Sequence, residues 1–120
     1  MKILLDEQVN KIIKSALIAD FQVFRLRDLD WLGYQNGLLR EKMNENKFTF
    51  LITSDKNMPF QQNFKKINFT IILMDTPTTS RIHQSLFIDK ILKALPHSGI
   101  SALSRKSMLV EDKIEIYVTA

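Results

Sequence analysis

The chain has 120 residues and 14.0 kDa, with 17 basic and 13 acidic side chains, a formal net charge of +4 and a pI of about 9.4. This length suits a single domain, residues 1–120, and the basic excess suits either a polyanion such as nucleic acid or an ordinary solvated surface. The absence of cysteine excludes disulfides and thiolate metal sites and favours the cytoplasm, and no apolar stretch approaches the roughly 18–20 residues that span a bilayer.

The first half of the chain alternates predicted strands and helices. Residues 2–5 form a continuous apolar run, which predicts a buried strand. Apolar residues then recur at i, i+3, i+4 and i+7 spacing, which predicts an amphipathic helix over residues 8–19. The alternating run "FQVFRL", residues 21–26, fits an edge strand with one face in water. Residues 36–46 then predict a shorter helix, and residues 48–53 a second buried strand.

The second half continues this alternation. The longest apolar run, residues 69–74, predicts another buried strand, and a third helix is predicted to begin near Ser80 and to end at Pro96. Residues 97–112 fit a loop, a short helix or an extra strand, and residues 114–118 close the chain as a strand. Alternating strands and helices predict an α/β sandwich with a mainly parallel sheet.

Acidic residues follow three of the predicted buried strands: Asp6 and Glu7 the first, Asp55 the next and Asp75 the last of the three. The carboxyl ends of parallel strands share one edge of a sheet, so these acids could converge. Converging carboxylates repel one another, and a hard cation such as Mg²⁺ or Mn²⁺ would neutralise them. We therefore predict Asp6 and Asp55 as metal ligands. Glu7 fits either this site or a first helical turn, and Asp75, before Thr-Pro, fits a turn.

The acid pair, Asp55 and the following Met58-Pro59 resemble the receiver domain of response regulators. This resemblance implies that Asp55 accepts a phosphoryl group while Asp6 and Glu7 hold Mg²⁺. Receivers also carry a lysine, commonly followed by proline, after their fifth strand, and no proline of this chain follows a lysine. A receiver-like phosphoacceptor domain is therefore the alternative interpretation.

A second resemblance covers residues 1 to about 95. In this order, it rests on the segments "MKILLDEQV", "VFRLRDLDWLGYQNGLL", "FTFLITSDKNMPFQQN", "FTIILM" and "SRIHQSL". They resemble the PIN-like proteins formerly listed as a domain of unknown function, which are similar to the toxin ribonucleases of toxin–antitoxin operons. The resemblance implies a three-layer α/β/α sandwich and an endoribonuclease dependent on Mg²⁺ or Mn²⁺. It also implies an RNA substrate, a small antitoxin partner and a homodimer.

The same resemblance implies which residues form the site. Asp6, Asp55 and Glu7 carry over as catalytic residues, with Asp6 and Asp55 on the metal. Asn36 and Asn57 stand where many PIN-like relatives have acids. These amides leave few sure carboxylates, so a non-catalytic PIN-like binding module is a further alternative.

Other residues complete the predicted site. Relatives often have Glu where this chain has Leu38, and Glu41 is the residue that could supply the missing oxygen. Lys56 and Arg81 are the candidates for binding the RNA backbone, although both also fit exposed surface positions. Trp31 fits packing better than stacking on a base.

Overall fold

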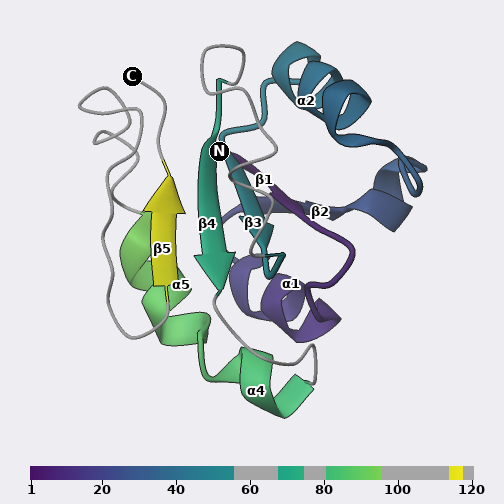
Figure 1. The fold of residues 1–120 in the computed structure, drawn as a ribbon. Helices are drawn as coiled ribbons and strands as arrows, with labels where there is room; N and C mark the ends of the chain where they lie inside the picture. Colours follow the sequence, from purple (N-terminus) through teal and green to yellow (C-terminus); the bar gives the residue numbers. More distant parts are fainter. Residues whose placement is uncertain (56–67, 75–80, 96–113, 118–120) are drawn as a thin grey trace.

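The computed structural model of the protein describes residues 1–55, 68–74, 81–95 and 114–117, which form a sheet flanked by helices (Figure 1). The five-stranded sheet has the order β2-β1-β3-β4-β5. Its strands are β1 Lys2–Leu5, β2 Gln22–Arg25, β3 Phe50–Thr53, β4 Thr70–Met74 and β5 Ile114–Tyr117. Neighbouring strands from β2 to β4 pair in parallel, and β5 pairs antiparallel with β4.

The predicted α/β fold with a mainly parallel sheet is confirmed. Each of the five predicted strands is present, and the alternating run forms β2 at one edge of the sheet, as predicted. The helices are α1 Lys11–Leu17, the 3₁₀ helix η1 Leu26–Leu29, α2 Asn36–Glu45, α4 Arg81–Ser85 and α5 Ile88–Ala94. None of these described helices has both the length and the apolar content that a bilayer crossing requires.

The predicted helix boundaries differ from the structure for local reasons. Helix α1 is shorter than predicted because the side chain of Asn10 accepts a hydrogen bond from the Ile12 N–H at 3.1 Å and so caps its start. The prediction of one long third helix was wrong. The N–H groups of Leu86 and Phe87 bond three residues back, to His83 and Gln84, and these tight turns separate α4 from α5.

Apolar side chains pack against both faces of the sheet. Side chains alternate along a strand, so Ile3 and Leu5 of β1 enter one cluster while Leu4 enters the other. The first cluster joins the sheet to α1 and α5, and the second joins it to η1 and α2. Because both faces are covered, the strands read as continuous apolar runs rather than alternating ones. The complete three-layer sandwich stays a prediction.

A short connection that the sequence did not predict leads from β2 to α2. The 3₁₀ helix η1 ends at Asp30, whose φ of 60° turns the chain inward. Trp31 then donates its main-chain N–H to the Leu26 carbonyl at 2.9 Å and buries its ring against Tyr34 and Phe48. Trp31 is 8% exposed, which confirms its interpretation as a packing residue.

Two adjacent leucines of α2 provide a matched test of this packing. Leu39 is 3% exposed and lies in the second cluster, whereas Leu38 is 41% exposed. Leu39→Ala should lower the free energy of unfolding by about 2–5 kcal/mol, because it removes buried methyl groups and leaves a cavity. Leu38→Ala, the same chemical change, should cost less than about 1 kcal/mol. Urea denaturation monitored by circular dichroism measures both, and equal losses would contradict this placement of α2.

Candidate functional site

The carboxyl ends of the parallel strands β2, β1 and β3 lie side by side and form one edge of the sheet, which we call the carboxyl edge. Leu5 of β1 pairs with Arg25 of β2 on one side and with Ile52 of β3 on the other. Asp6 continues this pairing by one residue, because its N–H donates to the Ile52 carbonyl at 3.0 Å. The next residue of β3 is Thr53, so Asp6 and Thr53 become neighbours.

Thr53 links the two aspartates that the sequence singles out. Its hydroxyl donates to Oδ2 of Asp6 at 2.8 Å and accepts the main-chain N–H of Asp55 at 3.0 Å. Thr53 is fully buried and Asp6 is 7% exposed, so solvent competes little for these bonds. The hydroxyl therefore fixes both the carboxylate of Asp6 and the backbone that carries Asp55.

The carboxyl group of Asp6 has a raised pKa. Burial raises its pKa above the ordinary value, and the charges of Asp55 and Glu7 raise it further. The hydrogen bonds from the Thr53 hydroxyl and from the Glu7 N–H, the latter at 2.8 Å to Oδ1, act in the opposite direction. The charges of Glu7 and Asp55 thus both act on the carboxyl group of Asp6.

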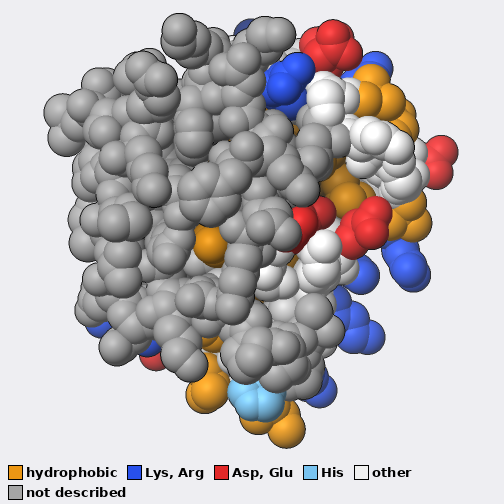
Figure 2. Space-filling view, viewed as in Figure 1, with side chains coloured by type: hydrophobic (Ala, Val, Ile, Leu, Met, Phe, Trp, Pro, Cys, Tyr) orange, Lys and Arg blue, Asp and Glu red, His pale blue; other side chains and the backbone are white. Residues whose placement is uncertain are grey.

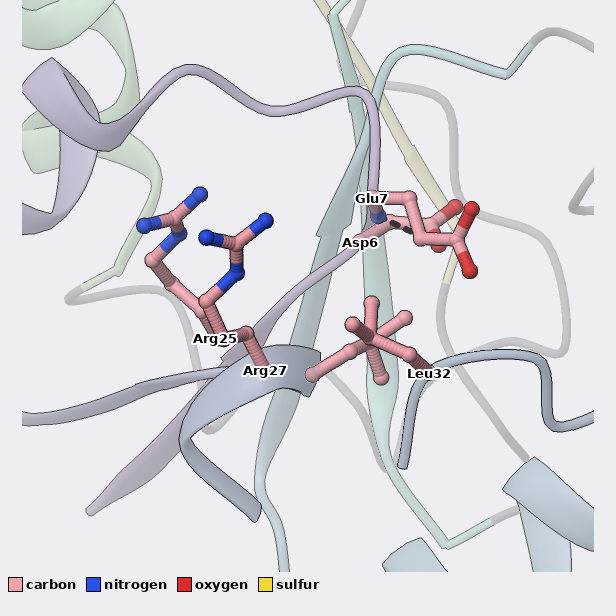
Figure 3. Close-up of a pocket in the computed structure, with 6 residues that line it drawn as sticks. Asp6, Glu7, Arg25, Arg27 and Leu32 are labelled. Atoms are coloured by element: carbon pink, nitrogen blue, oxygen red, sulfur yellow. Dashed lines mark hydrogen bonds between the residues drawn. The ribbon is translucent and has the colours of Figure 1, made fainter. Parts of the chain in front are cut away.

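A hollow of about 250 Å³ opens beside Asp6. It is lined by Asp6, Glu7, Arg25, Leu26, Arg27 and Leu32. Figure 3 shows the carboxylates of Asp6 and Glu7 at one side of the hollow and the guanidinium groups of Arg25 and Arg27 at the other. Glu7 is exposed, and its Oε1 lies 3.5 Å from the Gly33 nitrogen, so it faces the hollow. Both acids that follow β1 therefore line the same hollow.

A second buried side chain holds the segment that follows these acids. Gln84 of α4 is fully buried. Its Oε1 accepts the Asn10 N–H at 2.5 Å, and its Nε2 donates to the Gln8 carbonyl at 2.8 Å. One amide thereby satisfies two main-chain groups of the connection between β1 and α1. Gln84 thus fixes the path of the chain that leaves Glu7.

Of the remaining predicted residues, two with described side chains, Glu41 and Arg81, lie away from the hollow. Asn36 begins α2, Glu41 lies on the exposed surface of α2, and Arg81 begins α4 and is exposed. Neither Glu41 nor Arg81 lines the hollow. Lys56 and Asn57 lie outside the described residues, as does Asp75. The structure therefore brings together Asp6, Glu7 and Asp55.

Mg²⁺ or Mn²⁺ would find suitable donor atoms here. Carboxylate oxygens are the ligands that these hard cations prefer, and a cation would relieve the repulsion that acts on Asp6. Within the described ranges, no group of three or more His, Cys, Asp or Glu side chains is placed to hold a metal ion. An ion bound by Asp6 and Asp55 would thus need further oxygen from water or substrate, and the predicted metal centre stays a prediction.

Sequence reasoning missed four residues of this region. Arg25 ends β2 and Thr53 ends β3, so a parallel register between the predicted strands would have indicated both. Arg27 lies in η1, an element that carries no clear sequence signal. Gln84 contacts residues 74 and 76 positions away, and only the packing of α4 shows its role.

The surface around the site is mixed in charge. Figure 2 shows acidic side chains near the middle of the viewed face and basic side chains toward its right-hand and lower rim.

Comparisons with protein-family models, with curated proteins and with solved structures gave no match to this chain. The chemistry of the site is therefore derived from its own residues.

The Thr53 hydroxyl can be tested by two substitutions. Thr53→Val keeps the shape but removes the hydroxyl that donates to Oδ2 of Asp6 and accepts the Asp55 N–H, which should cost about 1–3 kcal/mol of stability. It should also raise the pKa of Asp6 above that of the wild type, because the Thr53 hydrogen bond lowers this pKa. Urea denaturation and ¹³C NMR titration of the carboxyl group measure the two effects.

Thr53→Ser is the matched control, because it retains the hydroxyl and loses only a methyl group. It should leave the pKa of Asp6 close to the wild-type value. If Val and Ser shift this pKa equally, the Thr53 hydroxyl does not stabilise the carboxylate.

The raised pKa of Asp6 also predicts that the stability of the fold depends on pH. The pKa of Asp6 in the folded protein is raised above its value in the unfolded chain. The contribution of this carboxyl group to the free energy of unfolding is therefore fully present at pH values below the unfolded pKa, and it is lost as the pH rises through the folded pKa. Asp6→Asn cannot ionise and avoids this loss. The thermal midpoint of Asp6→Asn minus that of the wild type should therefore increase from about pH 4 to about pH 8. A difference that decreases over this range would show that the ionised carboxylate stabilises the fold.

Proposed function

We propose that the protein is a PIN-like, metal-dependent endoribonuclease that hydrolyses RNA phosphodiesters. The observation that carries the proposal is the meeting of Asp6, Glu7 and Asp55 at the carboxyl edge of the sheet, where the buried Thr53 hydroxyl links Asp6 to the backbone of Asp55. Ligands of open α/β sheets bind at this edge. The segments that resemble PIN-like proteins include all three acids.

Each residue has a distinct role in the proposed reaction. Asp6 and Asp55 would hold Mg²⁺ or Mn²⁺, with Glu7 beside them at the hollow. The cation, when bound, supplies a water of lowered pKa and offsets negative charge on the phosphoryl oxygens. Thr53 orients the carboxylate of Asp6, and the burial of Asp6 excludes water that would weaken its interactions. Gln84 holds the connection after Glu7, so that the acids keep their positions.

The charge balance at this edge supports a cation in the proposal. An RNA phosphate that approaches Asp6 meets the charges of Glu7 and Asp55 as well. Adding a further anion to these carboxylates is unfavourable unless positive charge accompanies it. A divalent ion between the acids and the phosphate would supply that charge at the reacting group.

The biological setting belongs to the same proposal. The resemblance supports a toxin of a toxin–antitoxin pair that acts on RNA in the cytoplasm, binds a small antitoxin protein and forms a homodimer. The net charge of +4 suits a polyanionic substrate.

A receiver-like phosphoacceptor domain is supported less well. Receivers need a lysine after their fifth strand, close to the phosphorylated aspartate. In this protein β5 runs antiparallel to β4, and its last residue, Tyr117, pairs with Ile71 near the start of β4. The carboxyl end of β5 thus lies at the edge opposite to Asp6 and Asp55. The strand order matches the flavodoxin-like type, but the direction of β5 does not favour a receiver site.

Cleavage of RNA by matched variants tests the proposal. Wild type should cleave a mixed-sequence single-stranded RNA in Mn²⁺, and more slowly in Mg²⁺, which sheds its waters reluctantly. Asp6→Asn and Asp55→Asn should each lose roughly 100-fold or more, because they remove charge that holds the cation. Asp89→Asn, the same change on the exposed surface of α5, should cleave like the wild type. Gel analysis of end-labelled RNA gives the rates.

Two outcomes would contradict the proposal. If Asp55→Asn cleaves as fast as the wild type, the activity belongs to another site or to a contaminant. If purified wild type cleaves nothing in either cation, the protein is a non-catalytic PIN-like binding module.

A further inference from the structure

Two arginines face the acidic residues across the hollow. Arg25 ends β2 and is held beside Leu5 by the sheet register, and Arg27 follows in η1. Both arginines line the hollow together with Asp6 and Glu7. Their guanidinium groups lie on one side of the hollow and the carboxylates lie on the opposite side (Figure 3). The hollow therefore has an acidic wall and a basic wall.

Within the part of the chain that the structure describes, neither guanidinium group takes part in an ion pair. Among the described residues, the ion pairs join Lys14 to Asp28 at 2.8 Å and Lys42 to Glu45 at 3.7 Å. Asp28, the acid nearest to Arg25 in sequence, accepts the main-chain N–H of Arg25 at 2.9 Å and the ammonium group of Lys14. The side chains of Arg25 and Arg27 thus keep donors available for a ligand in the hollow.

The basic wall continues beyond the first hollow. A second hollow of about 310 Å³ shares Glu7 and Arg25 with the first. Its lining adds Lys11, the first residue of α1. Arg27, Arg25 and Lys11 therefore line two hollows that share Glu7 and Arg25. The two hollows together offer basic side chains to more than one phosphate group of a chain.

We propose that Arg25 and Arg27, extended by Lys11, bind the phosphodiester backbone of the RNA substrate and hold a phosphate opposite Asp6 and Glu7. This inference rests on the proposed function, and it assigns the backbone contacts to residues other than Lys56 and Arg81. A guanidinium group matches two phosphate oxygens with parallel N–H donors. The placement of donors on one wall and carboxylates on the other fits a phosphate between them.

Another role for the arginines would be purely internal. They could offset the charges of Asp6 and Glu7 and so stabilise the fold. In that case their removal would lower the thermal midpoint and leave RNA affinity unchanged. The salt dependence of RNA binding separates the two roles, because only phosphate contacts release counterions.

Binding is measured without cleavage. A fluorescein-labelled single-stranded RNA of about 12 nucleotides is titrated in EDTA, and anisotropy is followed over a series of NaCl concentrations. The double variant Arg25→Gln/Arg27→Gln should bind roughly tenfold more weakly. The slope of log K against log[salt] should become shallower by roughly 1.4, which is two contacts at roughly 0.7 each.

The matched control removes the same charge elsewhere. Arg40→Gln/Lys93→Gln also loses two positive charges, from α2 and α5, and neither residue is among the lining residues of the two hollows described above. It should keep the wild-type salt slope. The inference is overturned if Arg25→Gln/Arg27→Gln binds like the wild type, or if the control weakens binding equally.

Two further arms complete the test. If the double variant does not fold, Arg27→Gln alone, at an exposed position, should make the slope shallower by roughly 0.7, and unchanged binding would overturn the inference. Single-stranded DNA of the same sequence should lose affinity by the same factor, because the contacts are to the backbone. A loss confined to RNA would contradict a backbone contact.

Failure of this inference is distinguishable from failure of the proposed function. RNA binding that depends on Arg25 and Arg27, without cleavage in Mn²⁺, would leave this inference standing alone. Cleavage by the wild type together with unchanged RNA binding by the arginine variant would remove this inference and leave the nuclease.

Discussion

The hydrogen bond from the Thr53 hydroxyl to the buried carboxylate of Asp6 is the interaction on which the site depends. A carboxylate that is only 7% exposed is costly unless donors surround it, and this one receives bonds from Thr53 and from the Glu7 N–H. The bond to Thr53 exists because β1 and β3 run parallel in a register that sets Leu5 beside Ile52. A slip of one residue would turn Thr53 away from Asp6.

The same register arranges charge around that carboxylate. It sets Arg25 at the end of β2 beside the end of β1, while the turn after Thr53 brings Asp55 near Asp6. The edge of the sheet thus carries carboxylates with arginines across a hollow from them. Such an arrangement is poorly suited to binding an anion at the acids alone, and well suited to a cation at the acids with a phosphate on the arginines.

Distant parts of the chain stabilise this edge. Gln84 lies in α4, yet its amide satisfies main-chain groups of Gln8 and Asn10, directly after the acids of β1. The packing of α4 against α1 is therefore coupled to the position of the connection that follows Glu7. In the same way, the burial of Trp31 and η1 against the other face fixes the segment that carries Arg27.

The sequence by itself determined the strands and the class of fold. Strands covered on both faces are mostly apolar, so their continuous apolar runs predict strands without tertiary information. The sequence also indicated the acids that follow β1 and β3, because they come directly after apolar runs and ligands bind at the carboxyl ends of parallel strands.

Only the tertiary structure decided which polar side chains meet those acids. Thr53 and Arg25 required the register between strands, and Gln84 required the docking of α4. The direction of β5 likewise depended on its pairing with β4, because the apolar pattern of a strand does not show whether the strand pairs parallel or antiparallel with its neighbour. Local sequence patterns encode burial and helical or extended geometry. Contacts between residues far apart depend on packing and register, which no single segment specifies.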